Sequence, residues 1–159
     1  MKFINIDFPA KKDEVISMIT DNEAVNKNVR FEEGKGKPFM KVKIKNNDKI
    51  RMTCEMLGKA TRDNGFLVGT YFAGRLVEKS DKTVLKGVIL TAPIYHLFMM
   101  ILVVVFILQC FYLKGFSVIP ILLVGFDIFM FKDEFKKQGY IKRYLHRAAR
   151  RIWDKASLT

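Results

Sequence analysis

The sequence predicts an α+β protein with three successive parts: a small antiparallel sheet with helices, a pair of apolar helices and a basic amphipathic helix. Apolar and charged residues alternate with period two over much of residues 1–93, which indicates strands. An almost uncharged stretch follows over residues 94–131, and residues 132–159 carry basic side chains at helical spacing. We therefore divide the chain into domains at residues 93 and 131.

The first part begins with a strand, because Ile4, Ile6 and Phe8 alternate with polar residues. Residues 10–28 then have apolar side chains at helical spacing and predict one or two short helices. Two hairpins follow, over residues 40–56 and 66–91, each with a polar turn in its middle. The expected sheet has five or six antiparallel strands, with the early helices packed on one face.

Residues 94–113 and 116–131 are almost free of charge; Lys114 lies between them and Asp127 near the far end. As helices they would cover roughly 30 Å, the thickness of a bilayer's hydrocarbon core, and roughly 24 Å. A chain of 159 residues leaves too little polar protein to cover two such helices on all sides. We therefore expect a transmembrane hairpin and an integral membrane protein.

Basic residues near the ends of the two expected spans predict their orientation. Lys114 alone lies in the connecting turn, whereas Lys82 and Lys86 precede the first span and several basic residues follow the second. The N-terminal residues up to Glu14 do not resemble a signal peptide. The expected location is the cell membrane, crossed more than once, with both termini cytoplasmic. The lysine-rich, arginine-poor composition fits a low-GC bacterium, so we expect a bacterial protein.

Three polar residues inside the expected spans are candidates for function. Asp127 is the most unusual, because a carboxylate costs at least ~2.5 kcal/mol at the centre of a span. In an antiparallel hairpin, His96 would lie close enough to pair with it. Gln109 lies toward the outer end, where polar side chains commonly join two helices. Helix pairing and the handling of an ion or ligand both remain open for these residues.

The C-terminal part predicts a basic amphipathic helix. Its apolar residues fall at helical spacing and are Phe135, Ile141, Leu145, Ala148 and Ile152. The candidate residues for binding a membrane surface are Lys136, Lys137, Lys142, Arg143, Arg147, Arg150, Arg151 and Trp153. Beside a membrane, they predict attraction to anionic headgroups at about 1 kcal/mol per basic residue. The alternative is that the apolar stripe packs on the sheet. Nucleic acid is not favoured as a partner, because no nucleic-acid-binding motif accompanies the charge.

The order of strand, helix pair and antiparallel strands over residues 1–91 is similar to that of the helix-grip folds, the START and polyketide-cyclase-like proteins. The resemblance implies a curved sheet closed by the C-terminal helix, with an apolar ligand between them. One face of the first hairpin would then line a pocket through Met40, Met52, Cys54 and Met56. The plainer interpretation is that these residues form core, since methionine adapts to irregular apolar packing.

The sequence offers little for catalysis or for a cofactor. His96 and His146 lie in different parts of the chain, as do Cys54 and Cys110, so neither a metal cluster nor a disulfide is predicted. We assign no catalytic, cofactor-binding or metal-binding residue, expect no cofactor and do not favour an enzyme. The expected function is a membrane-anchored, non-enzymatic binding or regulatory module at the cytoplasmic surface, which contacts lipid, a protein partner or a second copy of itself. The alternative is a lipid- or apolar-ligand-binding protein or enzyme with its pocket under the methionine-rich face.

Overall fold

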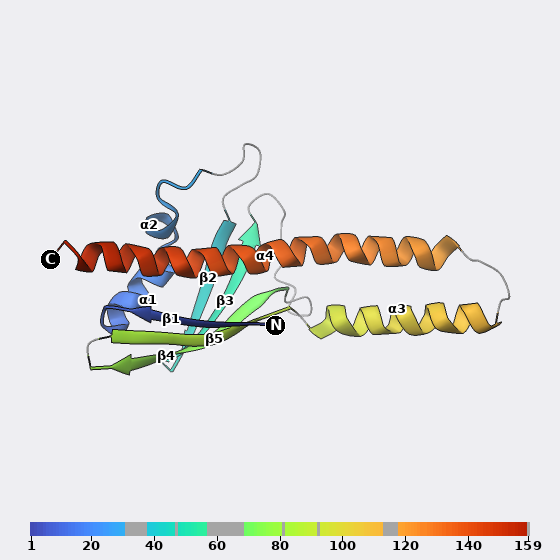
Figure 1. Cartoon of the computed structure of the whole chain (residues 1–159), viewed down its shortest axis with the longest axis horizontal. Coiled ribbons are helices and arrows are strands. Elements are labelled where there is room, and N and C mark those ends of the chain that lie inside the picture. Colours follow the sequence, from blue (N-terminus) through green and yellow to red (C-terminus); the bar gives the residue numbers. More distant parts are fainter. Residues whose placement is uncertain are drawn as a thin grey trace.

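The computed structural model describes residues 1–30, 38–46, 48–56, 69–80, 82–91, 93–112 and 118–158. The elements are β1 (Lys2–Phe8), α1 (Lys12–Thr20), α2 (Asn22–Asn26), β2 (Pro38–Lys45), β3 (Lys49–Met56), β4 (Tyr71–Lys79), β5 (Lys82–Leu90), α3 (Pro93–Tyr112) and α4 (Val118–Ala156). The five strands form one antiparallel sheet in the order β1-β5-β4-β3-β2 (Figure 1). The protein is therefore α+β with a five-stranded antiparallel sheet.

The alternation of apolar and polar residues gives the sheet one buried face. Ile6 lies opposite Leu85 in the β1–β5 pair, and Met52 lies opposite Phe72 in the β3–β4 pair. All four side chains belong to the hydrophobic core. Their neighbours along each strand point to the other face, because successive side chains of a strand alternate.

Two glycines give the Phe72 ring its place on this face. Gly74 and Gly87 lie opposite each other in the β4–β5 pair. A Cβ atom added to Gly87 would approach within 2.5 Å of both Phe72 Cζ and the Ala73 carbonyl oxygen. The absence of a side chain at Gly87 therefore lets the aromatic ring lie directly against the strands.

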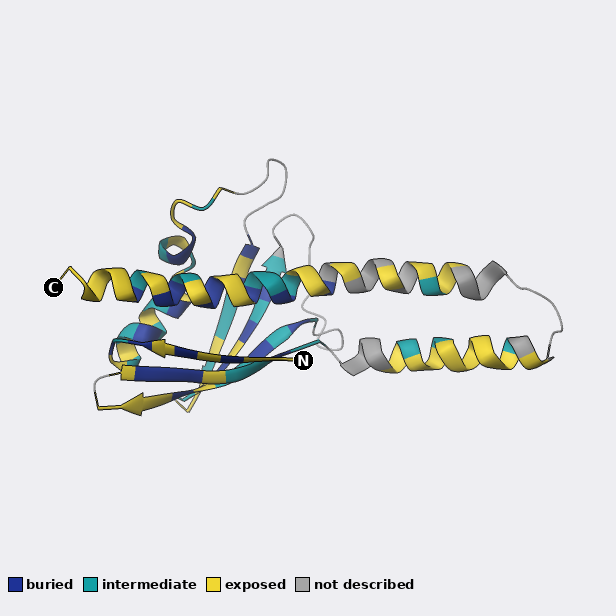
Figure 2. Cartoon of the chain, in the orientation of Figure 1, coloured by how far each residue is buried: buried dark blue, intermediate teal, exposed yellow. Residues whose placement is uncertain are grey.

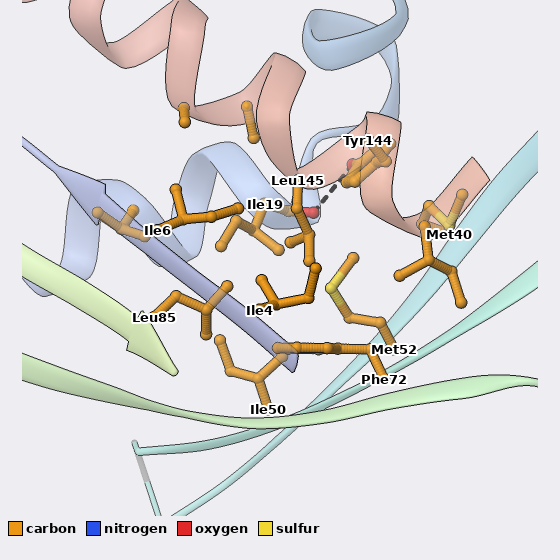
Figure 3. Packing of buried hydrophobic residues seen from close by; sticks show 14 of the residues in the cluster. Ile4, Ile6, Ile19, Met40, Ile50, Met52, Phe72, Leu85, Tyr144 and Leu145 are labelled. Atoms are coloured by element: carbon orange, nitrogen blue, oxygen red, sulfur yellow. Dashed lines mark hydrogen bonds between the residues drawn. The ribbon is translucent and has the colours of Figure 1, made fainter. Parts of the chain in front are cut away.

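The second half of α4 covers the buried face of the sheet, together with α1 and α2 (Figure 1). Tyr144, Leu145 and Ile152 on α4 are at most 1% exposed. The Tyr144 hydroxyl donates a hydrogen bond of 2.9 Å to the Ile19 carbonyl oxygen at the end of α1, as Figure 3 shows. The sequence left two positions open for the C-terminal helix, on a membrane surface or packed on the sheet. The structure shows it packed on the sheet.

Helix α4 is one continuous helix of 39 residues, although the sequence suggested separate helices before and after residue 131. Its first half extends beyond the sheet alongside α3, and we call these two segments, α3 and residues 118–131, the helical projection (Figure 1). Most described side chains of the projection are exposed, as Figure 2 shows. The exposed large apolar residues of the projection include Leu97, Phe98, Met100, Ile101, Phe106, Phe111, Leu122 and Ile128.

The predicted transmembrane hairpin over residues 94–113 and 116–131 is wrong. Among the described residues, no helix is both long enough and apolar enough to cross a bilayer. In α4 the apolar half continues into a strongly basic half. The finding also overturns the expected class of integral membrane protein and the multi-pass location with both termini cytoplasmic.

Candidate interaction surface

The side of α4 that faces away from the sheet is strongly basic. Its exposed basic residues recur at helical spacing and are Lys132, Lys136, Lys142, Arg143 and Arg150. Three large apolar residues share this side and are Ile128 (60% exposed), Phe135 (60% exposed) and Trp153 (56% exposed). We call these eight residues the outer face of α4. Long basic side chains interleaved with exposed apolar ones are typical of helices that lie in a membrane interface.

Five of the eight residues predicted to bind a membrane surface lie on this face: Lys136, Lys142, Arg143, Arg150 and Trp153. The other three have structural contacts. Arg151 donates a hydrogen bond of 2.7 Å to the Lys27 carbonyl oxygen, next to the end of α2. Arg147 is half-buried, and burial lowers the pKa of its guanidinium, with a further contribution from the nearby charge of Arg143.

Lys137 belongs to a buried polar cluster that the sequence did not reveal. Its Nζ lies 2.6 Å from Oε1 of Glu134, whose side chain is 5% exposed. The other carboxylate oxygen accepts a hydrogen bond of 2.6 Å from the backbone N–H of Thr70. A Cβ atom at Gly69 would lie 2.9 Å from that oxygen, so the glycine leaves space for the carboxylate. The cluster fixes α4 to the start of β4.

A second polar contact lies one turn further along α4. Gln138 is 3% exposed, and its Nε2 donates a hydrogen bond of 2.7 Å to Oγ1 of Thr91. Thr91 directly follows β5. Glu134 and Gln138 therefore attach α4 to the ends of two adjacent strands, at the place where the helix leaves the sheet and enters the projection.

The methionine-rich face lies inside the hydrophobic core. Met40, Met52 and Cys54 are at most 5% exposed, and they belong to the same cluster as Tyr144 and Leu145. Figure 3 shows Met52 pointing toward α4. Burial raises the pKa of the Cys54 thiol to about 12, so the thiol is a poor nucleophile at neutral pH. The side chain of Met56 lies outside the described residues.

The polar residues predicted within the spans are only partly described. Gln109 lies on α3, and its Oε1 is buried without a hydrogen-bond partner among the described residues. The side chains of His96 and Asp127 lie outside the described residues, so the pairing predicted between them stays a prediction.

Within the described parts of the chain, no group of His, Cys, Asp and Glu side chains is arranged to hold a metal ion. The arrangement that the structure does provide is electrostatic. Exposed guanidinium and ammonium groups on a rigid, packed helix can bind phosphates and carboxylates.

Comparisons with known proteins add little to this description. No family model matches the sequence, and no curated protein matches it. One solved structure with similarity to the chain is the solution structure of the Aha1 dimer from Colwellia psychrerythraea. The two are 19% identical, and the similarity covers 55% of this chain and 74% of that chain with a TM-score of 0.36.

Proposed function

We propose that this protein is a non-enzymatic binding module that associates with anionic lipid surfaces through the outer face of α4. The observation that carries the proposal is the combination on one side of one helix of exposed Lys and Arg with exposed Phe135 and Trp153. Basic side chains supply attraction to anionic headgroups, and aromatic side chains favour the region between headgroups and acyl chains.

The packing of α4 supports this proposal in two ways. The apolar stripe of the helix is already buried against the sheet, so its outer face is presented in a fixed orientation. Arg151 and Lys155 also hold the end of α4 against α2 and α1, through the Lys27 carbonyl oxygen and the Glu14 carboxylate, each at 2.7 Å. A rigid face loses little conformational entropy when it binds.

The exposed apolar side chains of the projection favour a second candidate function, self-association. Monomeric proteins rarely expose contiguous apolar patches larger than a few hundred Å². Along α3, exposed apolar residues occur on several sides of the helix, among them Leu97, Phe98 and Met100. A second copy of the chain, packed along α3, would remove these side chains from water.

Co-sedimentation with vesicles tests the lipid proposal. The full chain is mixed with phosphatidylcholine vesicles that contain phosphatidylglycerol, at low and at physiological salt. We expect binding that weakens with salt, because screening shortens the reach of charge to ~8–10 Å. The double variant Lys142→Gln/Arg150→Gln should lose about 2 kcal/mol of binding free energy, or about 30-fold in affinity.

The matched control is Lys49→Gln/Lys86→Gln. It removes the same charge from exposed positions on the side of the sheet opposite α4. This variant should bind vesicles like the native protein. Equal losses in the two variants would attribute binding to net charge instead of the outer face of α4. An absence of vesicle binding by the native chain at low salt would refute the proposal.

A further inference from the structure

The side of the sheet that α4 does not cover carries rows of basic side chains. In the register of the strands, Lys86 on β5 lies opposite Arg75 on β4, Arg75 lies opposite Lys49 on β3, and Lys49 lies opposite Lys45 on β2. In the next row, Arg51 lies opposite Lys43. All of these side chains are exposed. We call them the basic ladder: Lys43, Lys45, Lys49, Arg51, Arg75 and Lys86.

Like charges directly opposite each other destabilise an antiparallel pair. Part of this charge is offset by described residues. Arg75 lies 3.5 Å from the Asp48 carboxylate, the Arg51 guanidinium lies 4.4 Å from the centre of the Tyr71 ring, and Lys86 interacts electrostatically with the Asp7 carboxylate. Lys43, Lys45 and Lys49 have no carboxylate within ion-pair distance among the described residues. Their charges are therefore available to an external anion.

A second copy of this chain does not supply that anion. The net charge of the chain is +12. Several described carboxylates already pair with lysines of the same chain, among them Asp7 with Lys82, Glu14 with Lys155 and Asp48 with Lys12. Two copies would therefore repel each other at the ladder.

The lipid surface proposed for α4 does not supply it either. Helix α4 lies on one side of the sheet (Figure 1). The ladder lies on the other side, because its residues alternate along the strands with the buried ones. A planar bilayer in contact with the outer face of α4 is therefore separated from the ladder by the thickness of the domain.

Single-stranded nucleic acid is disfavoured by the position of the aromatic residues. Proteins of that class stack successive bases on neighbouring aromatic rings. Phe3 and Phe39, which share the uncovered side, lie on β1 and β2, the two outermost strands of the sheet. The ring between them, Tyr71, is already stacked with Arg51. The described ladder thus offers charge without a stacking platform.

We propose that the basic ladder binds an acidic segment of a partner protein, rich in Asp and Glu and extended in conformation. Neighbouring strands are ~4.8 Å apart, so the row from Lys86 to Lys45 spans about 14 Å. An extended segment of about five residues covers the same length at ~3.3 Å per residue. Its carboxylates would pair with the lysines of the row and neutralise their mutual repulsion.

The test measures binding of a fluorescent peptide of fifteen glutamates to the full chain at low salt. The ladder variant is Lys45→Gln/Lys49→Gln/Lys86→Gln, which leaves the Arg75–Asp48 pair in place. The matched control, Lys142→Gln/Arg143→Gln/Arg150→Gln, removes the same charge from the outer face of α4. We expect the ladder variant to bind at least 30-fold more weakly and the control less than threefold more weakly. Urea unfolding should show that the ladder variant is at least as stable as the native chain, because like charges have been removed.

Three results would overturn the proposal. Equal losses of peptide affinity in the two variants would show that binding depends on the net charge of the chain and not on the ladder. An oligothymidine of the same charge that binds more tightly than the peptide, and loses affinity in the ladder variant, would assign the surface to nucleic acid. Loss of vesicle binding in the ladder variant, but not in the control, would assign it to lipid. The lipid proposal for α4 is tested separately, by the variants Lys142→Gln/Arg150→Gln and Lys49→Gln/Lys86→Gln in the vesicle experiment.

Discussion

Glu134 shows how one carboxylate can position a helix. The side chain lies in the basic half of α4, yet it is almost fully buried and is satisfied by the Thr70 N–H and by Lys137. A buried charge is tolerated only when it is paired and hydrogen-bonded, because its desolvation costs several kcal/mol. The same side chain that would repel an anionic partner is thereby removed from the surface and used to attach α4 to β4.

We predict that Glu134→Ala lowers the free energy of unfolding by about 3 kcal/mol, because it leaves the Lys137 ammonium and the Thr70 N–H without their partner. Glu134→Gln keeps an acceptor for Thr70 and should cost less. Urea unfolding followed by circular dichroism measures both. Glu78→Ala, at an exposed position on β4, is the control and should change stability by less than about 0.5 kcal/mol. A loss below 1 kcal/mol in Glu134→Ala would show that the cluster does not stabilise the fold.

Cys54 makes the free energy of unfolding depend on pH in the alkaline range. Burial raises its thiol pKa from the ordinary value of 9.0 to about 12 in the folded chain. Above pH ~9 the unfolded chain loses the thiol proton while the folded chain keeps it, so the unfolding free energy falls as pH rises. Burial raises the pKa of the Tyr144 hydroxyl as well, which acts in the same direction at higher pH.

From pH 7.5 to pH 10.5, Cys54 should contribute a decrease of about 2 kcal/mol in the free energy of unfolding. The measurement is urea unfolding at several pH values, with Cys54→Ala as the comparison because other groups also titrate in this range. The variant should begin less stable at pH 7.5 and should lose about 2 kcal/mol less on the way to pH 10.5. Parallel curves for the two proteins would contradict the assignment.

The strands were predictable from the sequence because their alternation reports a purely local geometry. Ile4, Ile6 and Phe8 point into the core as period two requires, and β2 and β3 pair around a turn at Asn46, which has a positive φ of 51°. The basic ladder was visible only in part, as lysines that alternate along β2. Its rows depend on the register across four strands, which the alternation within one strand does not determine.

Helix α4 was harder to predict, because its buried side includes polar residues and its exposed side includes apolar ones. Ile141, Leu145, Ala148 and Ile152 form the buried stripe that their spacing indicates. Phe135 was assigned to the same stripe but is exposed, because six residues at 100° each place it about 120° away from Ile141. The stripe continues instead through Glu134 and Gln138, whose polar side chains conceal it in the sequence. The apolar composition of residues 94–131 also suggested spans that the described helices do not support.

In the molecule as a whole, the projection is an insertion between β5 and the half of α4 that covers the sheet. The hydrogen bond between Thr91 and Gln138 holds the chain before the projection next to the chain after it. Among the described residues, every member of the hydrophobic core comes from β1–β5, α1, α2 or the covering half of α4, or from Ala10 in the link between β1 and α1. The core of the domain is therefore complete without α3.

We predict that replacing residues 93–131 with a linker of six Gly and Ser residues leaves the domain folded. Such a linker reaches about 20 Å, and residue 132 lies only about 9 Å along the helix from Gln138. Urea unfolding should give the same free energy of unfolding as the native chain within about 0.5 kcal/mol, since the core and the contacts of Glu134 with Thr70 and Lys137 are retained. We expect sedimentation velocity to show self-association of the native chain and a monomeric shortened chain at the same concentration. A shortened chain that unfolds at markedly lower urea would show that the projection stabilises the domain, and equal masses for both proteins would exclude α3 as a self-association surface.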